Sequence, residues 1–90
     1  MPRYLVKRTF PGGLALLAND AGADALHRVC DQNAVHGVDW LHSYVTADKE
    51  TTFCVYDAPD PEAIRAAAEA NGLPVDAITP VSVLVPHFYR

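Results

Sequence analysis

The stretch that decides the fold is VDWLHSYVT at residues 38–46, followed by ADKET at 47–51 and TFCVYD at 52–57. Residues 38–46 and 52–57 are rich in β-branched and aromatic side chains, which favour strands. The five residues between them are polar and suit a hairpin loop. The stretch therefore predicts two antiparallel strands in the middle of the chain.

The N-terminal half predicts a strand and then a helix. Residues 3–10 form a strand-like run that stops at the Pro-Gly-Gly turn of residues 11–13. A helix is predicted over about 21–35, with Gly37 as its stop signal. One helical face would carry Ala23, Leu26, Val29, Cys30 and Asn33.

The C-terminal half predicts a second helix and a last strand. Asp60 is a helix-capping residue type, Pro61 fits the first helical position and Glu62 fits the positively polarised first turn. The inward stripe of this helix is predicted to hold Ile64, Ala67, Ala68 and Asn71, before Gly72 ends it. The last strand is predicted over 79–85.

The predicted order β-α-β-β-α-β is typical of the α+β ferredoxin-like fold. In that fold a four-stranded antiparallel sheet carries both helices on one face. Ninety residues make a single domain, 1–90, whose core is small. A second subunit would therefore help to stabilise it.

Composition and charge exclude several classes of protein. The net charge is −4, and the only dense basic cluster is Arg3, Lys7 and Arg8, which argues against a nucleic-acid partner. No apolar run approaches the length of a membrane span or a signal peptide, so neither is expected. Cys30 and Cys54 lie in different predicted elements, which favours free thiols in a reducing cytoplasm.

The alternation of side chains along the two central strands predicts two different sheet faces. A five-residue loop would place His42 opposite Tyr56 and Tyr44 opposite Cys54. The aliphatic set expected beneath the helices is Leu41, Val45, Phe53 and Val55. The panel expected on the uncovered face is Trp40, His42, Tyr44, Cys54 and Tyr56.

The sequence of strand one does not decide which of its two faces joins the panel. Either Tyr4, Val6 and Arg8 or Leu5, Lys7 and Thr9 would join the panel. An uncovered aromatic face needs a partner sheet, a ligand, or both.

His42 is the strongest candidate within the panel, because an imidazole can bind a metal or move a proton near neutral pH. The alternative is an ordinary hydrogen-bonded histidine. Cys54 is either a soft ligand or nucleophile, or a packed thiol. Tyr44 and Tyr56 are phenol donors to a ligand or ordinary strand residues, and Trp40 is expected to line a cavity or an interface.

The strings WLHSYVTADK at 40–49, FCVYDAP at 53–59 and EAIR at 62–65 resemble a small bacterial ferredoxin-like family of unknown function. Some of its members bind or respond to nickel. The resemblance implies a dimeric α+β barrel, with two sheets packed face to face, and makes nickel a candidate metal. Nickel-binding members of this family carry a Glu-His pair where this chain has Ala66-Ala67, so one possible ligand is missing here.

Three functions follow from the residues and the resemblance. The first is a homodimer that binds a metal ion, nickel by resemblance, or a small molecule, with His42 as the metal ligand. The second is a cofactor-independent enzyme of isomerase, cyclase or monooxygenase type. There His42 would be the acid/base, with Tyr44 and Tyr56 orienting an oxyanion. The third is a structural or regulatory dimer without a ligand. No organic cofactor is expected.

Overall fold

The computed structural model describes residues 1–15 and 20–89 and has the predicted order of elements. The strands are β1 (Arg3–Thr9), β2 (Asp39–Val45), β3 (Thr51–Asp57) and β4 (Ala77–Val81). The helices are α1 (Asp20–Val35), α2 (Pro61–Asn71) and a short 3-10 helix, η1 (Pro86–Tyr89).

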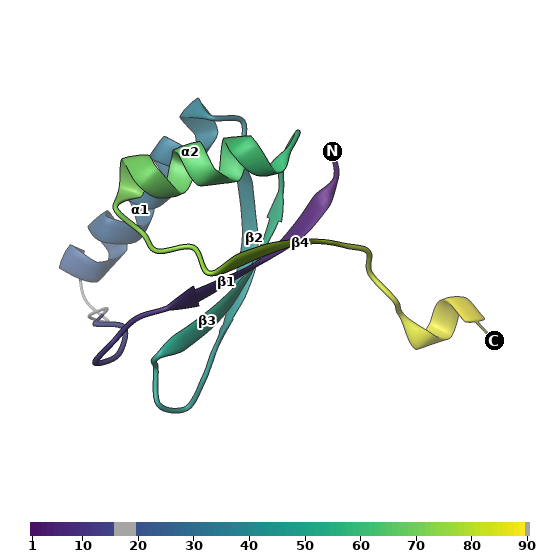
Figure 1. The fold of residues 1–90 in the computed structure, drawn as a ribbon, viewed down its shortest axis with the longest axis horizontal. Coiled ribbons are helices and arrows are strands. Elements are labelled where there is room, and N and C mark those ends of the chain that lie inside the picture. The colour runs from purple at the N-terminus through teal and green to yellow at the C-terminus, as the bar shows by residue number, and fades with distance from the viewer. Residues whose placement is uncertain (16–19, 90) are drawn as a thin grey trace.

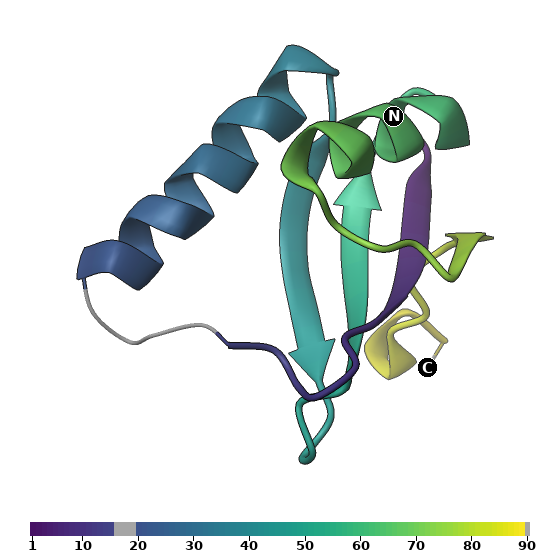
Figure 2. The ribbon, with the colours of Figure 1, turned by 60° about the vertical axis from the view of Figure 1, so that its left-hand side comes forward.

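All strand pairs in the sheet are antiparallel, and the strand order is β2-β3-β1-β4. Both α-helices lie on the same side of the sheet (Figures 1 and 2). This is the ferredoxin-like α+β fold that the sequence predicts, and the prediction is confirmed.

Helix α2 begins and ends as its sequence signals predict. The Asp60 side chain accepts a hydrogen bond from the Ala63 amide at 2.8 Å, and Pro61 occupies the first helical position. At the other end Gly72 adopts a φ of 67°, which a residue without a Cβ reaches at little cost. The predicted inward stripe is also correct, since Ile64, Ala67 and Ala68 are buried.

The core lies between α2 and the face of the sheet that carries Tyr4, Val6, Cys54 and Tyr56. Three small residues of α2, at positions 63, 67 and 68, leave room for the two tyrosine rings. The sheet face under the helices is therefore lined by aromatic and polar side chains as well as aliphatic ones. We call it the helix face, and we call the opposite side of the sheet the open face.

The predicted assignment of the two faces is wrong for β3. Cys54 and Tyr56 are buried on the helix face, whereas Phe53 and Val55 lie on the open face and are only half-buried. The sequence left two orientations possible for strand one. Tyr4 pairs with Tyr56 and Val6 with Cys54, so Tyr4 and Val6 lie on the helix face. These pairs put Leu5 and Lys7 on the open face.

The hairpin turn explains this inversion. Thr46 pairs with Thr51 through a backbone hydrogen bond of 3.0 Å, so the loop has four residues and not the predicted five. Lys49 turns the chain with a φ of 60°, and Asp48 accepts hydrogen bonds from the Thr46 hydroxyl and the Glu50 amide. A shift of one residue in register moves every following side chain to the other face.

A β-bulge divides β2 into two parts. Trp40 pairs with Tyr56 and therefore lies on the helix face, but the pairing slips by one residue before His42, which pairs with Val55. His42 and Tyr44 lie on the open face as a result, and Ser43 lies on the helix face. The prediction that Trp40 shares a face with His42 is wrong, because a bulge inserts one residue into the alternation.

Helix α1 differs from its predicted orientation by about one residue. Cys30 and Ala23 are exposed, whereas Gly22 and Asn33 are buried and Leu26 and Val29 are half-buried. The helix packs against α2 and β2 and contributes no side chain to the buried apolar core. The contact with α2 therefore decides which side of α1 faces the rest of the protein.

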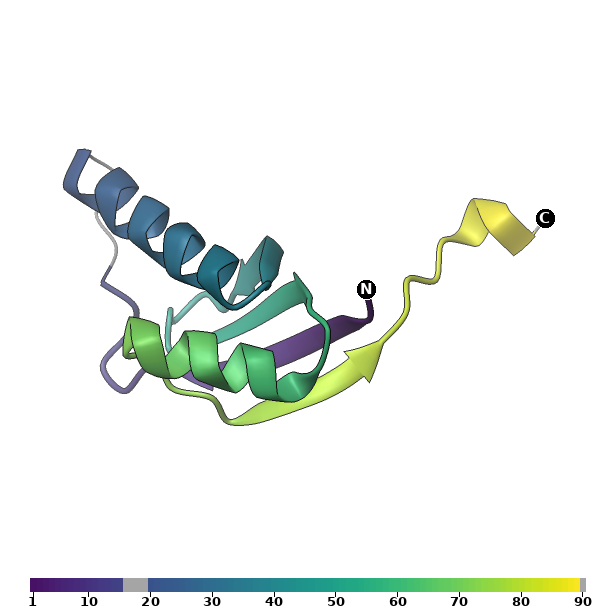
Figure 3. The ribbon, with the colours of Figure 1, turned by 90° about the horizontal axis from the view of Figure 1, so that it is seen from above.

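The last strand is shorter than predicted. β4 ends at Val81, which pairs with Arg3, the first residue of β1. Beyond that pair β1 offers no residue for β4 to bond. Residues 82–85 continue as an extended tail that leaves the body of the protein (Figure 3).

Candidate functional site

The open face carries an apolar panel across all four strands, next to the charged side chains of Arg3, Lys7 and Asp57. Its members are Leu5, His42, Tyr44, Phe53, Val55 and Val81, and we call this set the open-face panel. Both α-helices lie on the other side of the sheet, so neither covers it (Figure 2). Its aliphatic members and Phe53 are half-buried by their neighbours within the sheet, while His42 and Tyr44 are exposed.

His42 and Tyr44 form the polar part of the open-face panel. Their ring centroids are 5.2 Å apart and their planes meet at 87°, an edge-to-face arrangement. They are brought together because both follow the bulge on β2 and so point to the same side. Tyr44 remains 64% exposed, so the chain alone leaves this aromatic ring largely in contact with solvent.

An ion pair lies at one end of the open face. The Arg3 guanidinium donates to the Asp57 carboxylate from Nε (2.9 Å) and from Nη2 (3.2 Å). This contact, mainly through its hydrogen bonds, lowers the pKa of Asp57 below the ordinary carboxyl range. The pair joins β1 to β3 where α2 begins.

A pH dependence of stability follows from this lowered pKa. Because folding depresses the pKa of Asp57, its contribution is present above the ordinary carboxyl pKa of about 4 and is lost as pH falls through the folded value. We expect Asp57→Asn to reduce the acid-induced loss of stability in urea titrations below pH 4. Asp24→Asn, an exposed substitution on α1, should leave that loss unchanged. Equal acid sensitivity of wild type and Asp57→Asn would contradict this expectation.

A buried polar cluster lies on the helix face, where the sequence predicted no functional residue. It includes Tyr56, which was predicted on the uncovered face. Arg8 is only 3% exposed and donates from Nη1 to the Pro74 carbonyl (2.6 Å) and from Nη2 to the Tyr56 hydroxyl (3.2 Å). Its guanidinium carbon also lies 5.8 Å from the centre of the Tyr56 ring. Arg8 Nε is buried without a hydrogen-bond partner among the described residues. Burial raises the pKa of Tyr56, which keeps its phenol neutral.

The five predicted site residues are thus divided between the two faces. His42 and Tyr44 lie together on the open face, whereas Cys54 and Tyr56 are buried on the helix face. Trp40 is half-buried against the core and donates from its indole nitrogen to the Ser43 hydroxyl at 2.8 Å. The expectation of one panel holding all five is wrong, while the role of each residue in binding stays a prediction.

Arg8 is the buried residue that the sequence-based reasoning missed. The alternation of Tyr4, Val6 and Arg8 contains the signal, since two apolar residues two positions apart share a face with the arginine. The sequence did not favour either orientation of strand one, because each of its two sides mixes apolar and polar residues.

The two thiols are free, as expected from the sequence. Cys30 is exposed on α1 and Cys54 is buried on β3. Within the part of the chain that the structure describes, no three His, Cys, Asp or Glu side chains come together in a way that could hold a metal ion. None of the helices described there has the length and apolar character of a transmembrane span.

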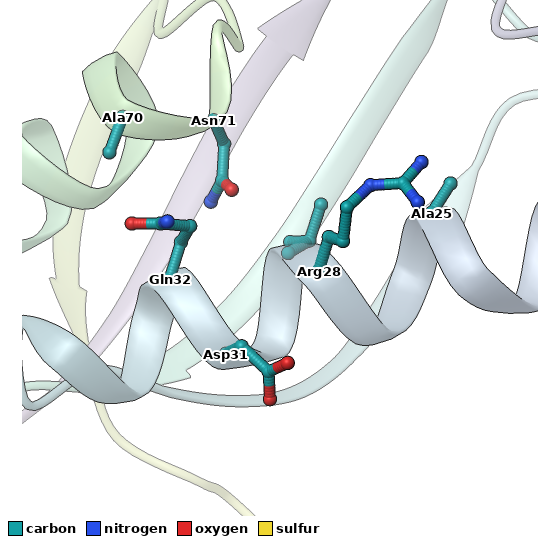
Figure 4. Close-up of a pocket in the computed structure, with 7 residues that line it drawn as sticks. Ala25, Arg28, Asp31, Gln32, Ala70 and Asn71 are labelled. Carbon is teal, nitrogen blue, oxygen red and sulfur yellow. The ribbon is translucent and has the colours of Figure 1, made fainter.

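An open groove separates α1 from α2, with a volume of about 490 Å³. Gln32 and Asn71 point toward each other across it (Figure 4). Asn71 donates to the Asn33 side chain at 3.3 Å, which ties the two helices together beside the groove. None of the predicted site residues lines this groove.

Comparisons with known proteins agree with the fold. The profile of the family described as "Nickel responsive protein SCO4226-like" matches residues 4–81. The crystal structure of SCO4226 from Streptomyces coelicolor A3(2) superposes with a TM-score of 0.66 at 17% identity, covering 92% of this chain and 99% of SCO4226. No curated protein matches the sequence. This chain therefore belongs to the SCO4226-like family of nickel-responsive proteins.

Proposed function

We propose that this protein is a homodimeric metal-ion-binding protein, with nickel as the metal and the open-face panel as the binding surface. The observation that carries the proposal is the placement of His42 beside Tyr44 on a sheet face that neither α1 nor α2 covers. The family's description as nickel-responsive supplies the choice of metal.

The apolar character of the open-face panel supports the dimer. Leu5, Phe53, Val55 and Val81 place four apolar side chains on one side of a small sheet. Soluble monomers seldom leave such a contiguous apolar area to water. Two copies packing sheet against sheet, about 10 Å apart, would bury both panels at once.

The donor set of one chain fits nickel only in part. Imidazole is a good ligand for Ni²⁺, and His42 is exposed and free to turn toward an ion. The described residues of one chain, however, do not assemble three His, Cys, Asp or Glu donors. The proposal therefore requires both copies, so that His42 of each chain contributes to the same dimer face.

The geometry gives less support to an enzyme of the isomerase, cyclase or monooxygenase type. That function would need His42 and Tyr56 to act on one substrate, but the two side chains lie on opposite faces of the sheet. Tyr56 is also occupied by its contact with Arg8. Metal binding needs only groups that share the open face.

Replacing His42 with Ala tests the proposal directly. We expect Ni²⁺ titrated into the untagged protein to bind at least about tenfold more weakly, because the imidazole ligand is lost. The fold should be kept, since exposed substitutions usually change stability by less than about 0.5 kcal/mol. Calorimetric titration measures the affinity, and thermal unfolding checks the fold.

His27→Ala is the matched control, because His27 is an exposed histidine on α1, away from the open face. It should bind Ni²⁺ as the wild type does. Wild-type affinity in His42→Ala would remove His42 from the site, and a wild type that binds no Ni²⁺ would end the metal proposal.

A further inference from the structure

The groove between α1 and α2 takes no part in the proposed metal site. Its volume is about 490 Å³, which is in the range of pockets that hold small molecules. It lies between the helices, on the other side of the sheet from the open-face panel (Figure 2). A ligand of this groove would therefore be separate from anything bound at His42.

One wall of the groove is a single side of α1. The residues that form it are spaced at three and four positions, which places them along one stripe of the helix: Ala25, Arg28, Val29 and Gln32. The facing wall is formed by Ala70 and Asn71 of α2. The groove thus combines an apolar lining with one cation and two amide groups.

The guanidinium of Arg28 has no acidic partner within residues 1–15 and 20–89. Asp31 stands three positions along α1, at the spacing of a helical ion pair, yet it forms none with Arg28. Figure 4 shows the two side chains pointing to different sides of the helix. Arg28 is therefore available to pair with a carboxylate, to which a guanidinium can donate two hydrogen bonds.

The facing wall favours a positive charge, because α2 ends there. The capping amides of Gly72 and Leu73 bond the carbonyls of Glu69 and Ala68. Among the described residues no backbone amide bonds the next two carbonyls, at positions 70 and 71. Unbonded carbonyls make the C-terminus of a helix its negative pole, where cations are stabilised.

Asn71 adds a hydrogen-bond acceptor to this wall. Its side-chain nitrogen donates to the Asn33 side chain, which is held in place because Asn33 is only 4% exposed. This bond uses the donor group of the Asn71 amide. The Asn71 side-chain oxygen accepts no hydrogen bond from the described residues and is left for a donor in the groove.

We propose that the groove binds a small amino acid with an apolar side chain. Its carboxylate accepts hydrogen bonds from Arg28, and its ammonium group donates to the Asn71 side-chain oxygen at the negative end of α2. Its side chain packs against Val29 and the two alanines of the lining. A ligand with both charges also avoids the repulsion that a simple anion would meet from a chain of net charge −4.

The test is a titration of the full-length, isotopically labelled protein with L-leucine, followed by the amide shifts in NMR spectra. We expect saturable shifts in residues 25–32 and 70–72. Two analogues keep the apolar part of leucine and lack one charge each: 4-methylpentanoate has no ammonium group, and 3-methylbutylamine has no carboxylate. Each should bind at least about tenfold more weakly than leucine, because each loses a charge-assisted hydrogen bond.

Arg28→Gln tests the carboxylate contact. We expect leucine to bind this variant at least about tenfold more weakly, because the guanidinium is lost. Arg65→Gln is the matched control, since Arg65 is an exposed arginine of α2 that pairs with Glu62 and does not line the groove. It should bind leucine as the wild type does. Both positions are exposed, so both variants should keep the wild-type fold.

Three results would each overturn the proposal. The first is the absence of saturable shifts at the groove with leucine at tens of millimolar. The second is an affinity for 4-methylpentanoate equal to that for leucine, which would remove the ammonium contact. The third is wild-type affinity in Arg28→Gln, which would remove the carboxylate contact. None of them bears on nickel, since His42 does not line the groove.

Discussion

Ile64→Ala is expected to destabilise the protein by about 2–5 kcal/mol, the largest effect of any single substitution considered. Ile64 is 1% exposed and is the largest side chain that α2 buries against the tyrosine-lined helix face. Its loss removes apolar contacts and leaves a cavity, because the β-sheet below cannot collapse to fill the space. Urea unfolding monitored by circular dichroism measures the change.

This loss is large in comparison with the total stability of a small domain, which is usually about 5–15 kcal/mol. Val35→Ala supplies the control, since Val35 is an aliphatic residue of the other helix that is 75% exposed. It should change the unfolding free energy by less than about 0.5 kcal/mol. A cost below 1 kcal/mol for Ile64→Ala would show that α2 is not packed on the sheet as described.

The sequence was a good guide where structure depends on neighbours along the chain. Asp60 and Pro61 identified the start of α2, and Gly72 its end, because caps and left-handed termini are satisfied by groups one to four residues away. The order of elements followed from the same kind of local pattern. The fold class could therefore be predicted before any contact was known.

The sequence was a poor guide to the faces of the sheet, because these depend on register. A turn of four residues in place of five, with Lys49 in the left-handed region, moved Cys54 and Tyr56 beneath the helices. The bulge after Trp40 then moved Trp40 to the helix face, away from His42 and Tyr44. Neither the four-residue turn nor the bulge has a strong sequence signal. In the turn, the residue with a positive φ is a lysine, which is uncommon there.

The general expectation that aliphatic residues belong under helices also misled the assignment. Helix α2, which packs on the sheet, is rich in alanine. Its small side chains leave space for the tyrosine rings at positions 4 and 56, so Phe53 and Val55 are not required beneath the helix. The buried Arg8 supports this arrangement, because its guanidinium donates a hydrogen bond to the Tyr56 hydroxyl. His42 lies beside Tyr44 on the open face, whereas its other predicted neighbours, Trp40, Cys54 and Tyr56, lie on the helix face.

The interaction between Arg8 and Tyr56 leads to the last prediction, a double-mutant cycle. Tyr56→Phe should cost about 1–3 kcal/mol, because Arg8 Nη2 loses its acceptor while the guanidinium stays buried. Burial makes this loss more severe than at a surface site, since water cannot replace the phenol freely. Arg8 Nε already has no partner among the described residues, so the cation is poorly satisfied even in the wild type.

Removing the charge should abolish most of that cost. In Arg8→Met a flexible apolar side chain of similar length replaces the guanidinium, and the loss of a poorly satisfied buried charge offsets the lost contact with Pro74. Tyr56→Phe introduced into Arg8→Met should then change stability by less than about 1 kcal/mol. The cycle would give a coupling energy of roughly 1–2 kcal/mol from urea unfolding of the four proteins. Additive effects of the two substitutions would mean that Arg8 and Tyr56 do not depend on each other, and that the buried cation is satisfied in some other way.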